Sequence, residues 1–291
     1  MKVVVLGKGF VSKYIVNFLM GSGHSVLHLS RKEYDYHDEV KLDELLYGYK
    51  GVRYDTIINT AGFTGKPNVD QCEEKKDECF YYNVTLPKNI ESLCKKHEKR
   101  FIHISSGCIY TGYDKHYTEE DTPNFGMFNE ESSFYSLSKH ASELVLDETF
   151  TNIIRIRMPL CDDLSSKNLL TKLLNYDYII DFVNSKTDVY KLSEFVYAVV
   201  ENFKAGIYNA VHSNALSTKE VVEILKEYDL DNENWTFIPY AELDIKANRS
   251  NCVLDNSKSE EDFNFEWSDE ETYIRLNASL ISNRKNWNAK E

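Results

Sequence analysis

The first twenty residues hold the feature that most limits how this chain can fold. An apolar run from Lys2 to Leu6 leads into Gly7 and Gly9, and a helix-like pattern follows from Phe10 to Met20. Two glycines between a strand and a helix allow a tight turn and a close approach of the backbone to a pyrophosphate, whose charge then faces the helix N-terminus. The segment therefore predicts a dinucleotide-binding βα unit, although Ser12 stands where the G-x-G-x-x-G pattern has its third glycine.

Strand-like and helix-like runs alternate along the first half of the chain. Further expected strands cover residues 25–29, 55–58, 101–104 and 152–157, and the expected helices between them include 87–97 and 133–149. Short β-rich runs separated by helices form βαβ units, whose parallel strands carry helices on both faces of the sheet. The chain therefore predicts an α/β fold built on a doubly wound parallel sheet.

The pattern changes after Met158 and Pro159, where polar stretches begin to interrupt shorter helices. This change indicates a smaller second lobe. A further helix-then-strand pattern at 192–211 indicates that the chain returns to the sheet before it completes that lobe. We therefore expect an interleaved arrangement. Residues 1–158 and 187–212 would form a Rossmann domain that binds a dinucleotide, and residues 159–186 and 213–291 would form a substrate-binding lobe.

The composition excludes several functions. With a net charge of −13 the chain lacks the cationic surface that nucleic-acid binding requires, so we expect no nucleic-acid partner. The N-terminus already reads as a strand and no apolar run is long enough to span a membrane, so we expect a cytoplasmic protein without a membrane partner. None of the six cysteines forms a C-x-x-C pair, which predicts neither a metal site nor a disulfide framework.

The end of the second expected strand bears on the choice of cofactor. An NAD site usually carries an acidic residue there, which binds the ribose 2′-hydroxyl, but here Ser30, Arg31 and Lys32 follow the strand. A hydroxyl and two cations suit a 2′-phosphate. A solvated charged turn is the alternative interpretation, but after a glycine loop the pattern favours NADPH as the cofactor.

A phenol, an ammonium and a hydroxyl form the candidate catalytic group. Tyr135 and Lys139 are four residues apart and therefore share one face of the expected helix at 133–149. Ser106 ends the strand that precedes this helix. Because ligands of doubly wound folds bind at the carboxyl ends of the strands, the three side chains can converge on one ligand.

Together these features resemble the extended short-chain dehydrogenase/reductase family, which shares the glycine loop, Ser106, Tyr135-x-x-x-Lys139 and the run NTAG at 59–62. Longer segments narrow the resemblance to bifunctional UDP-4-keto-6-deoxyglucose 3,5-epimerase/4-keto-reductases, the second half of plant-type UDP-L-rhamnose synthases, also known in giant viruses. These segments are AGFTGKPNVDQCE (61–73), GCIY (107–110), EEDTPNF (119–125), SFYSLSK (133–139), RIRMP (155–159), KNLLTK (167–172) and ANRSNCVLD (247–255). The resemblance covers nearly the whole chain, and its main departure is the Gly7 loop, which is one residue short and ends in Ser12.

The resemblance implies a reaction and a set of roles. The substrate would be UDP-4-keto-6-deoxyglucose, supplied by a separate 4,6-dehydratase, and the product UDP-L-rhamnose. Tyr135 would donate a proton to the carbonyl oxygen as hydride reaches carbon 4, while Lys139 lowers the tyrosine pKa and Ser106 hydrogen-bonds the carbonyl. Cys108 and Lys172 would move protons at carbons 3 and 5, whose hydrogens the ketone acidifies. The resemblance also implies a homodimer.

Further residues complete the implied site. The expected cofactor contacts are Gly7, Gly9, Phe10, Val11, Ser30, Arg31, Asn59, Ala61, Asn83, Tyr135, Lys139 and Met158. The expected substrate contacts are Lys66, Asn68, Ser106, Asn124 and Arg249. A purely structural asparagine is an equally good interpretation of Asn83. For Arg249, whose guanidinium would hold the substrate diphosphate, the alternative is an ordinary exposed arginine.

Two other functions stay open at this point. One is a reductase alone, which would act on a UDP- or dTDP-linked sugar that a separate protein has already epimerised. The other is a non-catalytic regulatory subunit that binds NADP, although the presence of Ser106, Tyr135 and Lys139 together argues against it. A buried cysteine at a strand end is most often a packing residue. The roles of Cys108 and Lys172 therefore decide between the bifunctional enzyme and the reductase alone.

Overall fold

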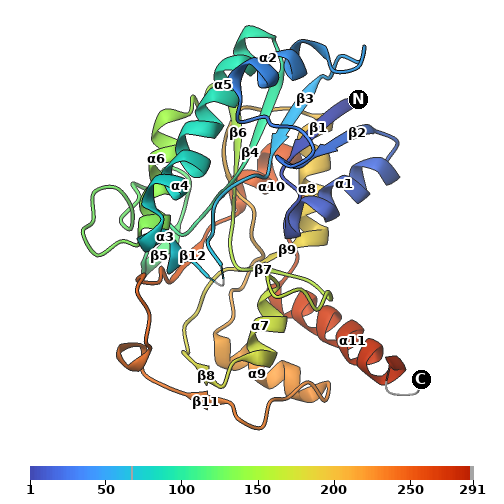
Figure 1. Ribbon diagram of the computed structural model, residues 1–291. Helices are drawn as coiled ribbons and strands as arrows, with labels where there is room; N and C mark the ends of the chain where they lie inside the picture. Colours follow the sequence, from blue (N-terminus) through green and yellow to red (C-terminus); the bar gives the residue numbers. More distant parts are fainter. Residues whose placement is uncertain (67, 289–291) are drawn as a thin grey trace.

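The computed structural model describes residues 1–66 and 68–288, and a six-stranded parallel sheet forms its centre (Figure 1). The strands are β1 (Lys2–Leu6), β2 (Ser25–Leu29), β3 (Thr56–Asn59), β4 (Arg100–Ser106), β6 (Thr151–Ile156) and β10 (Gly206–Asn209). They lie in the order β10-β6-β4-β3-β1-β2, and every neighbouring pair is parallel. The winding reverses between β2 and β3, so the carboxyl ends of β1 and β3 meet at the switch point where such folds bind their ligands.

Helices cover both faces of this sheet, because its strands are apolar on both sides. The covering helices are α1 (Phe10–Gly21), α2 (Glu39–Gly48), α5 (Leu86–Lys96), α6 (Phe134–Val145) and α8 (Val189–Glu201). Val3 and Val5 of β1 share a core with residues of α1 and α8. Val4 and Leu6 share the opposite core with α2 and α5, and α6 lies on the same side as α5 (Figure 1). The predicted α/β class with a doubly wound parallel sheet is confirmed.

A smaller core lies below the sheet in Figure 1. Its elements are α7 (Leu169–Asn175), α9 (Thr218–Glu227), α11 (Glu270–Asn288) and two short strand pairs, β7 (Pro159–Leu160) with β9 (Thr187–Asp188) and β8 (Tyr178–Ile179) with β11 (Thr236–Phe237). Leu170, Val222 and Ile274 are fully buried in this core. In sequence α8 and β10 lie between these elements, but α8 packs against the large sheet and β10 is one of its strands. The chain therefore passes from one core to the other and back.

The remaining elements are short. They are α3 (Gln71–Glu74), α4 (Lys76–Phe80), the π-helical turn η1 (Tyr81–Thr85), β5 (Gly112–Tyr117), the 3-10 turn η2 (Tyr240–Glu242), β12 (Cys252–Leu254) and α10 (Ser257–Phe263). Strands β5 and β12 pair in parallel and share a small core with Cys108, just beyond the end of β4. Segments from distant parts of the sequence therefore enclose the end of β4.

Two helices differ from expectation. The helix predicted at 133–149 ends at Val145, because Leu146 adopts an extended conformation with φ −78° and ψ 148° and buries its side chain in the core shared with α5. The helix predicted at 87–97 begins at Leu86 and continues the π-helical turn Tyr81–Thr85, which the sequence pattern does not reveal. Turns of this kind are frequent at functional sites.

In the part of the chain that the structure describes, no helix is long and apolar enough to cross a membrane. Among the same residues, no group of histidine, cysteine, aspartate and glutamate side chains is arranged to hold a metal ion. All six cysteines are buried free thiols, so their chemistry is that of isolated or neighbouring thiols and not of disulfides.

Candidate active site

The glycine loop after β1 leaves room for a dinucleotide. Gly7 has a φ of +97°, and a Cβ there would lie 2.7 Å from the backbone nitrogen of Ala61, so only glycine fits between β1 and the loop after β3. A Cβ on Gly9 would meet no described atom within 4 Å, so the surface at the N-terminus of α1 is open there. Phe10 and Val11 begin α1 directly after this opening. An open backbone at a helix N-terminus suits a pyrophosphate, and these residues fit the predicted dinucleotide.

Ser12 replaces the third glycine without opening a gap. Its side chain is fully buried, and its hydroxyl accepts a hydrogen bond from the Gly9 N–H (2.9 Å) and donates one to the Gly9 carbonyl (3.0 Å). The Nε2 atom of His28 lies 3.0 Å from the Gly7 carbonyl oxygen. The serine at position 12 therefore holds the glycine loop through hydrogen bonds to Gly9, and α1 stays packed against β1.

The segment after β2 carries the predicted 2′-phosphate ligands, and a carboxylate already contacts one of them, Ser30. The backbone N–H and the hydroxyl of Ser30 both donate to Oε2 of Glu33, each at 2.9 Å. The Lys8 ammonium, from the glycine loop, lies 2.6 Å from Oε1 of Glu33. The Arg31 guanidinium lies 4.8 Å from the ring centre of Tyr82. The sequence analysis did not identify Glu33, because it follows the strand end by several residues and reaches Ser30 only through a turn.

Two buried asparagines shape the loop after β3. The Asn59 Oδ1 atom accepts the Ala61 N–H at 3.1 Å, and its amide nitrogen lies 3.2 Å from Nδ1 of His103. Asn83, in the π-helical turn, accepts the Phe63 N–H at 2.7 Å and donates to Oγ of Ser138 on α6 at 2.9 Å. Both side chains therefore hold the loop that follows Ala61, which favours the structural interpretation of Asn83; a direct contact of either residue with the cofactor stays a prediction.

The predicted catalytic group is brought together at the end of β4. Ser133 caps α6 by accepting the Ser136 N–H at 3.1 Å, which places Tyr135 in the first turn and Lys139 one turn later. The neighbouring Ser106 hydroxyl lowers the pKa of the Tyr135 phenol by a smaller amount than burial raises it. Burial, with a contribution from the Cys108 charge, holds the pKa of the Tyr135 phenol well above its ordinary value. Burial lowers the pKa of the Lys139 ammonium. The phenol is therefore protonated and able to donate.

The Cys108 thiol belongs to the same cluster. Its backbone N–H donates to Oγ of Ser106 at 3.3 Å, and its side chain is buried in the small core against which Tyr135 packs. Burial raises the pKa of the thiol, while the nearby hydroxyls of Ser106 and Ser136 and the charges of Arg157 and Lys139 lower it. Ser136 is a site residue that the sequence analysis missed; its position beside Tyr135 in α6 was the only available signal.

Lys172 belongs to a different group of charges. It is half-buried on α7, and burial, followed by the charges of Lys167 and Arg249, lowers the pKa of its ammonium. The charge of Lys66 acts on Lys167 in the same way. The positive charges of Lys66, Lys167, Lys172 and Arg249 thus influence one another, which is an arrangement that suits a phosphate-bearing ligand. Arg249 also pairs with Asp70 at 2.9 Å. The sequence analysis predicted three of these cations and missed Lys167.

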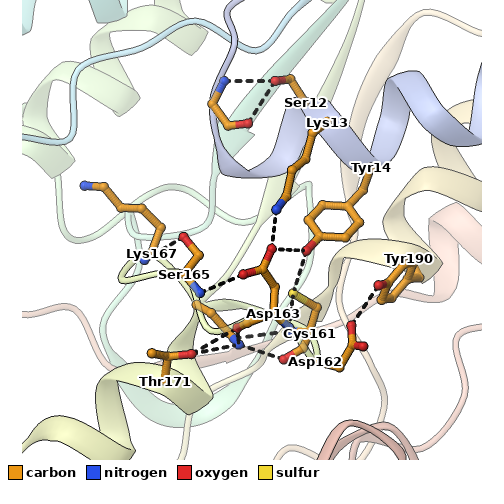
Figure 2. A network of polar contacts seen from close by, with 12 residues as sticks. Ser12, Lys13, Tyr14, Cys161, Asp162, Asp163, Ser165, Lys167, Thr171 and Tyr190 are labelled. Atoms are coloured by element: carbon orange, nitrogen blue, oxygen red, sulfur yellow. Dashed lines mark hydrogen bonds and ion pairs between the residues drawn. The ribbon is translucent and has the colours of Figure 1, made fainter. Parts of the chain in front are cut away.

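Figure 2 shows how the segment that carries Lys167 is tied to α1. The side chains of Lys13 and Tyr14 point from α1 toward Asp163, which pairs with the Lys13 ammonium and accepts a hydrogen bond from the Tyr14 hydroxyl at 3.0 Å. The same hydroxyl lies 3.2 Å from the Cys161 sulfur. These contacts therefore fix the position of the loop that bears Lys167 relative to α1, the helix that follows the glycine loop.

The remaining predicted residues have local roles in the structure. Asn124 uses its side chain to bond both the N–H and the carbonyl of Thr111, each at 2.8 Å, and Asn68 accepts the Asp70 N–H at 2.8 Å. Their contact with substrate stays a prediction. Met158 has a φ of +37°, a strained conformation for a side chain of this size. Strain of this kind concentrates at functional sites, which is consistent with the predicted place of Met158 beside the cofactor.

Comparison with known proteins identifies the family. The family model described as "RmlD substrate binding domain" matches residues 1–276. The chain belongs to this family, the RmlD-like reductases. It is 32% identical over 232 residues to the trifunctional UDP-glucose 4,6-dehydratase/UDP-4-keto-6-deoxy-D-glucose 3,5-epimerase/UDP-4-keto-L-rhamnose-reductase RHM1 of Arabidopsis thaliana, a match that covers 75% of this chain and 34% of the plant protein. The chain therefore spans about a third of that relative.

Two further proteins resemble this RmlD-like chain over most of their length. The bifunctional dTDP-4-dehydrorhamnose 3,5-epimerase/dTDP-4-dehydrorhamnose reductase of Arabidopsis thaliana is 31% identical over 240 residues, which cover 78% of this chain and 77% of the relative. The crystal structure of the L780 UDP-rhamnose synthase from Acanthamoeba polyphaga mimivirus has a TM-score of 0.85 at 23% identity and covers 96% of this chain and 99% of its own. The structural match shows a shared fold.

A buried ion pair anchors α6 of this RmlD-like protein. Arg155 on β6 contacts Glu143 on α6 at 2.7 Å, and Ser105 donates to the same carboxylate at 2.7 Å. We expect Glu143→Ala to lower the free energy of unfolding by about 3–5 kcal/mol, because it leaves the Arg155 guanidinium buried without its partner. Urea denaturation measures the change. As a control, Glu223→Ala breaks an exposed pair and should cost less than about 1 kcal/mol; equal losses would contradict the anchoring role.

Burial of Lys139 gives a pH-dependent prediction. The pKa of Lys139 is lower in the folded protein than its ordinary value of 10.5. At a pH below the folded-state pKa, the buried protonated ammonium therefore lowers the free energy of unfolding. This loss disappears as the pH rises from the folded-state pKa to 10.5. We expect Lys139→Met to raise the free energy of unfolding near pH 7 by about 1 kcal/mol, a usual gain at functional sites, and to remove part of the rise in stability at alkaline pH. Denaturation curves near neutral and alkaline pH test this, with Lys41→Met on α2 as an exposed control. A less stable Lys139→Met protein at both pH values would refute it.

Proposed function

We propose that this RmlD-like protein converts UDP-4-keto-6-deoxyglucose to UDP-L-rhamnose, by epimerisation at carbons 3 and 5 followed by NADPH-dependent reduction at carbon 4. The observation that carries the proposal is the Cys108 thiol, which lies in one buried cluster with Ser106, Tyr135 and Lys139. The activities for which the two plant relatives are named support the same reaction. A separate 4,6-dehydratase would supply the keto-sugar.

In the reduction, bound NADPH supplies the hydride. Tyr135 donates its proton to the oxygen of the 4-keto group, and its raised pKa keeps it protonated until the oxygen gains negative charge. Ser106 hydrogen-bonds the same oxygen. The Lys139 ammonium lies close enough to influence the cluster and stabilises the tyrosinate that remains after the transfer. The raised pKa of the phenol predicts that reduction stays pH-independent through the neutral range.

In the epimerisation, a base removes a proton beside the ketone and an acid returns one on the opposite face of the sugar. Burial raises the pKa of the Cys108 thiol, which favours the protonated form that can donate. Burial and two neighbouring cations lower the pKa of Lys172, which favours the neutral amine that can accept. We therefore assign the acid to Cys108 and the base to Lys172.

A reductase without epimerase activity is the second candidate. The grouping of Lys172 with Lys167 and Arg249 favours it, because a lysine in a cluster of cations can serve phosphate binding in place of proton transfer. In that case the substrate would be a UDP- or dTDP-linked 4-keto-rhamnose, and Cys108 would be a packing residue.

Product analysis separates these functions. The purified protein is incubated with UDP-4-keto-6-deoxyglucose and NADPH, and the sugar product is identified by NMR. UDP-L-rhamnose supports the bifunctional proposal. A 4-reduced sugar with unchanged configuration at carbons 3 and 5, or turnover only with 4-keto-rhamnose, supports the reductase. NADPH binding without oxidation in the presence of either sugar would indicate a binding module.

A further inference from the structure

Glu33 lies near the carboxyl end of β2, the part of this fold that binds the ribose 2′ substituent of a dinucleotide. It lies in the turn directly after β2, whose carboxyl end flanks the glycine loop. Its carboxylate takes three donors: the N–H and hydroxyl of Ser30 through one oxygen, and the Lys8 ammonium through the other. The donors come from both segments that border the predicted dinucleotide site.

The same three donors suit a phosphate. A backbone N–H, a hydroxyl and an ammonium that converge on two carboxylate oxygens would meet the oxygens of a 2′-phosphate equally well. The Glu33 carboxylate thus takes up the donors that would otherwise be free to bind a 2′-phosphate. The hydrogen bond from Lys8, followed by those from Ser30, lowers the pKa of Glu33 to about 2, so the carboxylate is ionised at neutral pH.

We propose that Glu33 sets the preference of this protein between NADPH and NADH. With Glu33 in place, its carboxylate accepts a hydrogen bond from the 2′-hydroxyl of NADH. For NADPH to bind, the carboxylate must leave Ser30 and Lys8, or must face the 2′-phosphate at short range. Either event weakens the binding of NADPH, and the binding of NADH requires neither. The inference rests on the proposed dinucleotide-dependent function.

The ion pair between Lys8 and Glu33 is weak enough for a cofactor phosphate to replace the carboxylate. The side chains of Lys8 and Glu33 are 39% and 50% exposed, and exposed ion pairs stabilise a fold by at most about 1 kcal/mol. Arg31, which has no ion pair among the described residues and lies over Tyr82, adds a nearby cation that can follow the phosphate. Both cofactors should therefore bind the unmodified protein, with a modest difference between them.

Removing the charge of Glu33 tests the inference without catalysis. Isothermal titration with NADPH and with NADH, in the absence of sugar, gives the two dissociation constants for the unmodified protein and for Glu33→Gln. We expect the ratio of the NADH constant to the NADPH constant to rise about tenfold in the variant, which corresponds to ~1.4 kcal/mol. Glu33→Ala should shift the ratio in the same direction, and circular dichroism checks that both variants fold.

Glu44→Gln is the matched control, because it removes an exposed charge from the same half of the molecule without touching Ser30 or Lys8; its ratio should stay unchanged. A ratio that changes less than twofold in both Glu33 variants, while both cofactors bind, overturns the inference and leaves the proposed function intact. Failure of the unmodified protein to bind either cofactor overturns both.

Discussion

Replacing Tyr135 with phenylalanine is expected to lower kcat for reduction of the 4-keto group by about 10²- to 10⁴-fold, the usual contribution of a general acid. The phenol is the donor that the carbonyl oxygen needs, and its raised pKa keeps it protonated. The ring itself stays, so the small core around Cys108 keeps its packing. Steady-state kinetics with NADPH oxidation as the signal measure the loss, and titration shows whether NADPH still binds.

The control for this substitution is Tyr47→Phe. Tyr47 is 65% exposed on α2, so the loss of its hydroxyl should leave kcat unchanged. A Tyr135→Phe protein that keeps kcat within a few-fold of the unmodified protein would remove Tyr135 from the mechanism. The Ser106 hydroxyl, the Cys108 thiol and the Lys139 ammonium would then be the remaining donors in the cluster.

The second large effect is expected from Cys108→Ala. The variant should form no UDP-L-rhamnose from UDP-4-keto-6-deoxyglucose, because the acid that returns protons to carbons 3 and 5 is gone. Reduction of a 4-keto-rhamnose that is already epimerised should stay within a few-fold, because Ser106, Tyr135 and Lys139 are intact. Product analysis with each of the two sugars measures the separation.

Cys94→Ala is the matched control, because Cys94 is also fully buried but lies on α5 in the core opposite α1. It should lose some stability and keep both activities. If Cys108→Ala still forms UDP-L-rhamnose at the rate of the control, Cys108 is a packing residue and the epimerase assignment is wrong.

Much of the fold was predictable because the apolar residues of the strands show which segments are buried. Val3, Val4 and Val5 are consecutive apolar residues, as a strand covered on both faces requires, and the sheet contains them as expected. The end of α6 was not predictable. The residues after Val145 continue a helical pattern, but Leu146 is drawn into the core beneath a neighbouring helix, which is a tertiary effect.

The catalytic cluster was predictable for a similar reason. Once Ser106 ends a parallel strand and Tyr135 opens the next helix, the topology brings both to one edge of the sheet. Glu33 and Lys167 were missed, because their roles depend on which charges the turns and lobes bring near them. The pairing of Glu33 with Lys8 joins residues 25 positions apart, and no local pattern marks it.

The most direct test of the bifunctional proposal is proton exchange without reduction. The purified protein is incubated with UDP-4-keto-6-deoxyglucose and NADP⁺ in deuterated water, so that the cofactor site can fill but no hydride is available, and NMR follows the sugar. The proposal predicts that deuterium enters carbons 3 and 5 with inversion of configuration. It also predicts that Cys108→Ala forms no inverted sugar, because Lys172 alone can exchange a proton only on its own face. No exchange at either carbon with the unmodified protein, in a preparation that reduces 4-keto-rhamnose, would contradict it.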